Sequence, residues 1–100
     1  MSSLRPTEGA RFLLERVSET ATHAVYRAAI YTPEAEFTAT ATLGDDGSVE
    51  LGPTGATAEL EAQLAMQAKL LARGATKRRD DGMPAWPARL LRWRGPGRGT

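Results

Sequence analysis

The stretch "AEFTATATL" at residues 35–43 alternates apolar and polar side chains over its whole length. A period of two places the two sets of side chains on opposite faces of an extended strand. The set expected to face a core is Ala35, Phe37, Ala39, Ala41 and Leu43. A strand with one apolar face needs neighbouring strands and a cover, so this stretch predicts a fold that contains a sheet.

The flanking segments supply partner strands for this stretch. "HAVYRAAIY" at 23–31 alternates in the same way, and "TPE" forms the turn between the two, since Pro33 fixes a φ typical of turns. On the other side, "GDDG" suits a hairpin loop, and Val49 and Leu51 then alternate with polar residues before "GPTG" ends the strand. These segments predict an antiparallel meander.

Residues 10–18 fit two structures. Ala10, Leu13, Leu14 and Val17 match one face of a helix. The segment also fits the two faces of a strand, with Phe12, Leu14 and Arg16 on one face and Leu13, Glu15 and Val17 on the other. We favour a strand, because the link to the next segment is short and Phe12 lies off the helical face. The meander therefore has three or four strands.

"TAELEAQLAMQAKLLARG" changes to a helical period. Its apolar stripe consists of Leu60, Leu64 and Leu71, extended by Gln67, Ala68 and Leu70. Thr57 suits the N-cap and Gly74 the position just past the end. The expected fold class is α+β: an antiparallel meander of three or four strands with one long helix, at 57–73, packed on one face, followed by a C-terminal basic-aromatic segment.

Composition after the helix divides the chain further. We expect an α+β domain over 1–74 and a linker over 75–85, where a basic cluster is followed by glycine and proline. An amphipathic Trp/Arg segment over 86–94 and a disordered tail over 95–100 complete the chain.

Composition also limits the chemistry. Seventeen alanines against two phenylalanines and two tyrosines predict a thin core with little room for a pocket of about 300 Å³ or more. The absence of cysteine excludes disulfides and thiolate metal sites. His23 is the only histidine, and "GDDGSVE" lacks the residues of a P-loop and the spacing of an EF-hand.

We therefore predict no catalytic residues, no metal and no cofactor, and expect neither an enzyme nor a protein with a small-molecule substrate. Carboxylate chemistry at Glu34, Glu36 and Glu50 is the third hypothesis, because an acid–base pair needs a buried setting that these strand positions lack.

The chain has no apolar leader and no apolar run of about 20 residues, which favours a cytoplasmic protein over a secreted or membrane-spanning one. Eleven arginines against two lysines, together with the alanine excess, are typical of a GC-rich genome and suggest a bacterial protein.

Charge is distributed unevenly. Residues 1–68 carry four basic and ten acidic side chains, a net charge of −6, whereas residues 69–100 carry nine basic and two acidic ones, a net charge of +7. Such a division suggests a basic region with an anionic partner, or with the acidic face of its own domain.

The candidate partner-binding residues are Trp86, Arg89, Leu90, Arg92, Trp93 and Arg94. If this segment is helical, Trp86, Leu90 and Trp93 share one face, which is too short for more than weak membrane attachment. Alternatively, Trp86, Leu90, Leu91 and Trp93 fold back and complete a core that is short of large residues.

The leading functional hypothesis is a small non-catalytic binding, adaptor or regulatory protein. It engages a protein partner, or a second copy in a homodimer, through the Trp/Arg segment or a sheet edge. The alternative is nucleic-acid binding, with phosphates contacted by Lys77, Arg78 and Arg79 and by the arginines that follow.

Overall fold

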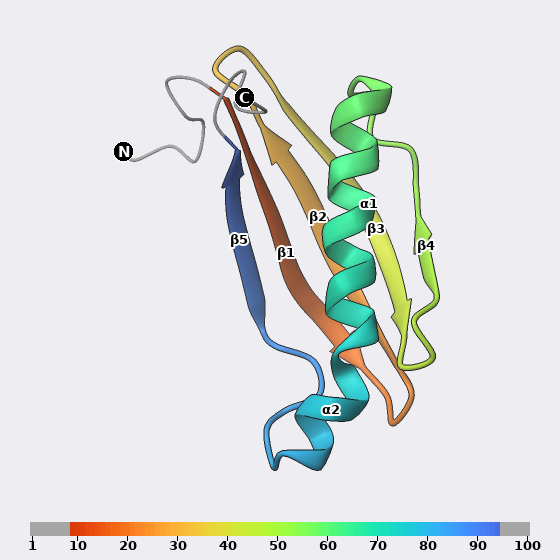
Figure 1. Ribbon diagram of the computed structural model, residues 1–100. Coiled ribbons are helices and arrows are strands. Elements are labelled where there is room, and N and C mark those ends of the chain that lie inside the picture. Colours follow the sequence, from red (N-terminus) through yellow and green to blue (C-terminus); the bar gives the residue numbers. More distant parts are fainter. Residues whose placement is uncertain (1–8, 95–100) are drawn as a thin grey trace.

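In the computed structural model, which describes residues 9–94, an antiparallel sheet of five strands carries a bent helix on one face (Figure 1). In chain order the elements are β1 (Ala10–Glu19), β2 (His23–Tyr31), β3 (Glu36–Gly44), β4 (Val49–Leu51), α1 (Ala58–Arg73), α2 (Ala75–Asp80) and β5 (Arg89–Arg94). The α+β class expected from the sequence is confirmed. The ambiguous segment 10–18 forms a strand.

The strands lie in the order β4-β3-β2-β1-β5, and all neighbours are antiparallel. The first four strands form the predicted meander, and the loop between β3 and β4 contains Gly47 with a φ of 91°. Hairpin loops need such a positive φ, which glycine adopts without a steric cost. β5 then pairs with the free side of β1, which brings Arg94 opposite Ala10.

The helix begins where the sequence predicts and continues further than expected. Thr57 Oγ1 accepts a hydrogen bond from the Leu60 N–H at 3.2 Å, so Thr57 is the N-cap. At Gly74 the backbone stays in the right-handed region, with a φ of −88°. The chain therefore bends there and continues into α2, which gives one bent helix of 23 residues.

The core lies between the sheet and α1, which packs over β2, β3 and β4 and leaves β5 uncovered (Figure 1). Its largest buried side chains are Phe12, Leu14, Tyr26, Ile30, Leu43, Leu64 and Trp86. Alanines fill the rest of the core and let the helix approach the sheet closely. Trp86 thus adds large volume to a core that would otherwise be thin.

The other face of the sheet is not covered by a helix of the described chain (Figure 1). Leu13, Ala29 and Tyr31 form a small second apolar cluster there. The threonines of β3 alternate toward this face as predicted, and Thr38 and Thr40 are exposed.

The C-terminal part differs from the sequence-based expectation in three ways. Residues 75–85, expected as a linker, include α2. Residues 89–94 form an edge strand, so the helical face considered for Trp86, Leu90 and Trp93 is wrong. Leu70, assigned to the apolar stripe, is 61% exposed because α1 does not reach over β5. The expected tail at 95–100 lies outside the described residues.

Neither helix within residues 9–94 has both the length and the apolar character needed to cross a bilayer.

The two tryptophans should differ in their contribution to stability. Trp86 is 2% exposed, and its replacement by alanine should lower the free energy of unfolding by about 3–5 kcal/mol. Trp93 is 52% exposed, and Trp93→Ala should change that free energy by less than about 1 kcal/mol. Urea unfolding followed by far-UV circular dichroism measures both, and equal losses would contradict the different placement of the two side chains.

Candidate functional site

The segment that leads into β5 is anchored through its backbone carbonyls. Three consecutive carbonyl oxygens each accept a hydrogen bond from the side chain of a different element. The bonds are Arg78 Nε to Ala85 O at 2.8 Å, Arg16 Nη1 to Trp86 O at 2.6 Å, and Tyr26 Oη to Pro87 O at 2.6 Å. The donors come from α2, β1 and β2, so this segment is held against both the helix and the sheet.

Tyr26 is buried in the core, and burial raises the pKa of its hydroxyl to about 12. The positive charges of Arg16 and Arg78 lower this pKa and offset part of the effect of burial. The hydroxyl therefore stays protonated at neutral pH and donates to Pro87 O.

The nucleic-acid alternative has Arg78 contact phosphates, but two nitrogens of its guanidinium donate hydrogen bonds inside the protein. Besides its bond to Ala85 O, its Nη2 donates to Leu71 O at 2.5 Å, at the end of α1. A Cβ at Gly74 would lie 2.6 Å from Arg78 Nη1, so the glycine leaves room for the guanidinium. Arg78 thus closes the bend between α1 and α2.

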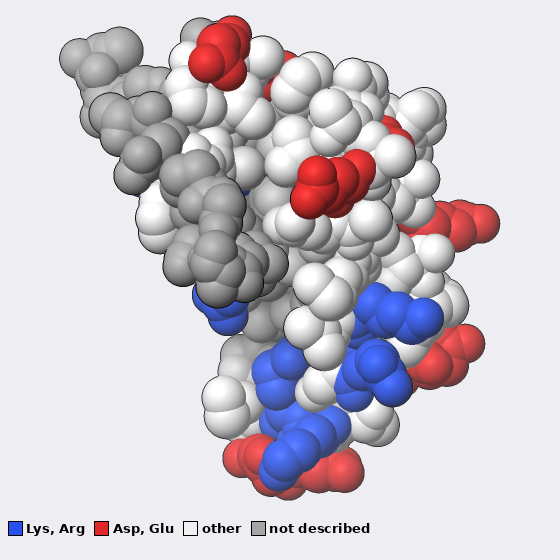
Figure 2. All heavy atoms as spheres, turned by 45° about the horizontal axis from the view of Figure 1, so that its top comes forward, with Lys and Arg blue, Asp and Glu red and all other residues white. Residues whose placement is uncertain are grey.

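The other basic residues of α2 also have partners within the chain. Lys77 Nζ pairs with Asp81 at 3.0 Å, and Arg79 pairs with Asp45 at 3.4 Å and donates to Ala21 O at 3.0 Å. Figure 2 shows Lys and Arg side chains gathered near the end of the molecule where α2 lies, with Asp and Glu side chains close by. The structure therefore places the predicted phosphate contacts in a region of mixed charge.

β5 is the edge strand on the side where α1 does not cover the sheet. The Arg16 N–H donates to Ala88 O at 2.9 Å, in the same register as the β1–β5 pairs. Because hydrogen bonding alternates along an antiparallel pair, Leu90 and Arg92 bond to β1. The residues that alternate with these two are Arg89, Leu91 and Trp93, and their backbone N–H and C=O groups point away from β1.

The side chains of β5 are divided between the two faces of the sheet. Leu91 and Trp93 lie opposite Leu13 and Arg11, on the face without a helix, where they are 37% and 52% exposed. Arg89 lies on that face too, with its Nε 3.9 Å from Glu15 Oε2. Leu90 is half-buried and packs against the core on the α1 side.

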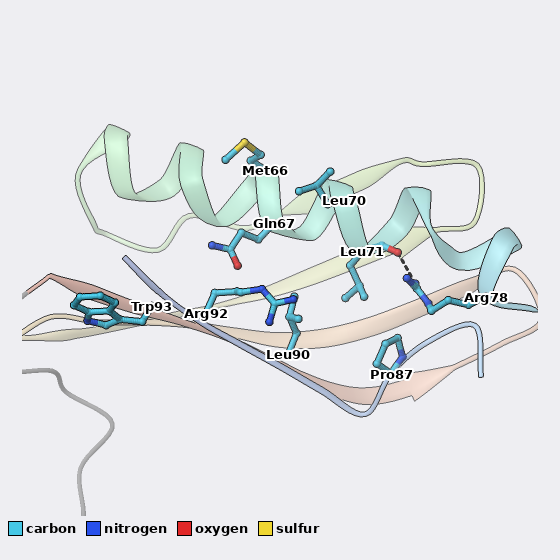
Figure 3. A pocket seen from close by; sticks show the side chains of 9 residues that line it. All are labelled: Met66, Gln67, Leu70, Leu71, Arg78, Pro87, Leu90, Arg92 and Trp93. Carbon is cyan, nitrogen blue, oxygen red and sulfur yellow. Dashed lines mark hydrogen bonds between the residues drawn. The ribbon is translucent and has the colours of Figure 1, made fainter. Parts of the chain in front are cut away.

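The helix side of β5 borders a groove of about 530 Å³ between α1 and the edge strand. It is lined by Met66, Gln67, Leu70, Leu71, Arg78, Pro87, Leu90, Arg92 and Trp93. Figure 3 shows Gln67 extending from α1 toward the sheet, above Arg92 of β5. Gln67 Oε1 is buried and has no hydrogen-bond partner.

This groove is larger than the alanine-rich composition led us to expect. Its volume lies in the range of about 300–1,000 Å³ typical of ligand pockets. The groove lies beside the core, because α1 does not extend over β5. Its volume therefore does not depend on how much space the alanine-rich core encloses.

The structure therefore separates the predicted partner-binding residues. Trp86 belongs to the core, whereas Arg89, Leu90, Arg92 and Trp93 lie along the edge strand. Arg94 pairs with Ala10 through the backbone. Met66, Gln67 and Leu70 were not expected to line a groove. The position of Met66 off the leucine stripe is the only sequence signal that could have indicated an open helix face.

His23 is the first residue of β2 and lies close to the loop between β3 and β4. Its Nδ1 is 2.8 Å from Thr22 Oγ1, and its Nε2 lies near Asp46 and Ser48 above Gly44. Hydrogen bonds from the hydroxyl and N–H of Ser48 lower the pKa of Asp46, so this carboxylate stabilises the loop. Within residues 9–94, no three His, Asp or Glu side chains gather as metal ligands would.

The carboxylates proposed for acid–base chemistry lie in the turn before β3 (Glu34), at the start of β3 (Glu36) and in β4 (Glu50). Glu34, Glu36 and Glu50 are all exposed. These positions do not provide the buried setting that an acid–base pair of carboxyl groups needs.

Comparisons with protein-family models, curated proteins and solved structures find no match.

Removing the guanidinium of Arg78 should destabilise the protein. Arg78→Met leaves Ala85 O and Leu71 O without their donor in a partly buried setting, which should cost about 1–3 kcal/mol. The control Arg79→Met removes an exposed pair and should cost less than about 1 kcal/mol. Thermal and urea unfolding measure both; equal effects would show that Arg78 does not anchor the bend.

Stability should fall at alkaline pH through Tyr26. Because folding raises the pKa of Tyr26 from 10.0 to about 12, its contribution is complete below pH 10 and is lost as the pH rises toward 12. The stability difference between the wild type and Tyr26→Phe should shrink by about 1 kcal/mol between pH 9 and pH 11. Urea unfolding at each pH measures this, with Tyr31→Phe as the control; a constant difference would contradict the burial of the neutral hydroxyl.

Proposed function

We propose that this protein is a non-catalytic binding domain that docks an extended segment of a protein partner along β5. The observation that carries this proposal is the exposed edge of β5. Its outward-facing backbone groups lie beside a groove and next to exposed apolar side chains.

An edge strand offers a row of unpaired N–H and C=O groups, to which an extended peptide can add as a further strand. The six residues of β5 span about 20 Å, enough for a peptide of similar length. Backbone bonds to Arg89 and Leu91 would supply affinity, and side chains on either face would supply specificity.

Charge favours a separate protein partner over a second copy of this chain. β5 carries Arg89, Arg92 and Arg94 within six residues, so pairing two copies along this edge brings like charges together. Arginine-rich edges are also one way in which proteins avoid self-association.

Nucleic-acid binding ranks second. The C-terminal excess of positive charge supports it, but Lys77, Arg78 and Arg79 each have an acceptor within the chain. A nucleic acid also offers no regular row of donors and acceptors to match an edge strand, and it does not suit an apolar groove.

The direction of the Leu91 N–H provides a direct test. Leu91→Pro removes an N–H that points away from β1, so the protein should fold with a loss of less than about 1.5 kcal/mol, because proline is tolerated at such edge positions. The control Leu90→Pro removes an N–H that faces β1 and should cost about 3 kcal/mol or more.

Binding is then tested with a blocked heptapeptide of alternating threonine and valine at millimolar concentration. Nuclear magnetic resonance should show slower amide exchange at Arg89 and Leu91 in the wild type, and no such change at Arg89 in Leu91→Pro. Unchanged exchange at β5 with neutral, acidic and basic peptides alike would overturn the proposal. A salt-dependent shift of short RNA that is lost in Lys77→Ala/Arg79→Ala would favour nucleic-acid binding instead.

A further inference from the structure

The central carbonyl of the exposed edge is occupied by a neighbouring side chain. Leu91 O points away from β1, and it accepts a hydrogen bond from Arg92 Nη1 at 3.1 Å. A peptide that adds to β5 must donate to this same oxygen. The guanidinium of Arg92 therefore lies where a partner strand has to bind.

Arg92 also differs from the other described arginine side chain of β5 in its surroundings. Arg89 lies 3.9 Å from Glu15, which offsets its charge. Arg92 makes no salt bridge with any side chain of residues 9–94. Its positive charge faces the groove without an acidic neighbour in that part of the chain.

The groove around Arg92 has apolar walls and one buried polar atom without a hydrogen-bond partner. Met66 and Leu70 are 51% and 61% exposed along α1, and Leu90 lies two residues from Arg92 on the same face of β5. Gln67 extends toward Arg92 from above, with its buried Oε1 unpartnered (Figure 3). A residue that enters beside Arg92 meets its guanidinium and the amide of Gln67, with apolar surface on either side.

We infer that the partner segment carries a carboxylate opposite Arg92, with apolar residues two positions away on the same face; this inference rests on the proposed docking along β5. The carboxylate forms charge-assisted hydrogen bonds with the guanidinium and draws it away from Leu91 O. The freed carbonyl then accepts the N–H of the partner strand. The apolar residues cover Leu90 and the exposed Leu70 and Met66.

The same arrangement disfavours other occupants of the groove. A second copy aligned on Leu91 would place Leu90 or another arginine, rather than a carboxylate, beside Arg92. A phosphate backbone would match the charge and leave the apolar walls in water. An acidic-apolar strand satisfies the cation, the apolar groove and the edge together.

Three blocked heptapeptides test this inference. The first is Thr-Val-Thr-Glu-Thr-Val-Thr, whose sequence is the same in either strand direction, and the others replace its glutamate by glutamine or lysine. We expect the glutamate peptide to bind at least about tenfold more tightly than the glutamine peptide, and the lysine peptide to bind most weakly. Isothermal titration calorimetry measures the affinity of each peptide, and amide exchange at Leu91 shows whether the peptide binds along β5.

Variants of the protein make the test specific. Arg92→Glu should reverse the order, so that the lysine peptide binds most tightly, and Arg92→Gln should remove the difference between the three. Arg73→Glu makes the same change of charge on α1 beside Gly47, away from the groove, and should keep the wild-type order.

The outcomes separate this inference from the docking proposal. If all three peptides slow exchange at Leu91 and bind with equal affinity, the edge docks strands but the acidic preference is wrong. If none of them changes exchange at β5, both the docking proposal and the inference are wrong. Preference for the glutamate peptide that persists in Arg92→Gln would also overturn the inference.

Discussion

Three hydrogen bonds to consecutive carbonyl groups determine where the C-terminal third of the chain lies. They join Ala85, Trp86 and Pro87 to donors from α2, β1 and β2. Two of the donors are guanidinium groups, whose hydrogen bonds are stronger than those between neutral partners. This anchor holds the bent helix to the sheet and keeps the indole of Trp86 in the core.

The position of β5, and with it the candidate site, follows from this anchor. From residues 85–87 the chain continues along the free side of β1, where it becomes the edge of the sheet. α1 packs over β2, β3 and β4, so β5 is left with a groove on its helix side and exposed backbone groups on its outer side. One set of contacts thus stabilises the fold and creates the surface on which the proposed function depends.

Local periodicity was enough to predict most of the elements. The alternation in β2 and β3, the leucine stripe of α1 and the N-cap Thr57 each depend on neighbouring residues, and the structure confirms them. β5 could not be found in this way, because adjacent leucines at 90 and 91 break the alternation of an amphipathic strand. Its strand conformation comes from pairing with β1, a partner about 80 residues away.

The sequence by itself determined the class of fold, the division of charge and the residue types at the edge. Only the tertiary structure decided which tryptophan is buried, which arginines are used internally and which one faces a groove. Charge and amphipathicity are properties of a side chain, but the acceptors that engage Arg78 and the acid that faces Arg89 come from elements far along the chain. Arg92 differs from Arg78 and Arg89 because it lies beside the groove that forms where α1 does not cover the sheet. That position is a consequence of how the helix packs.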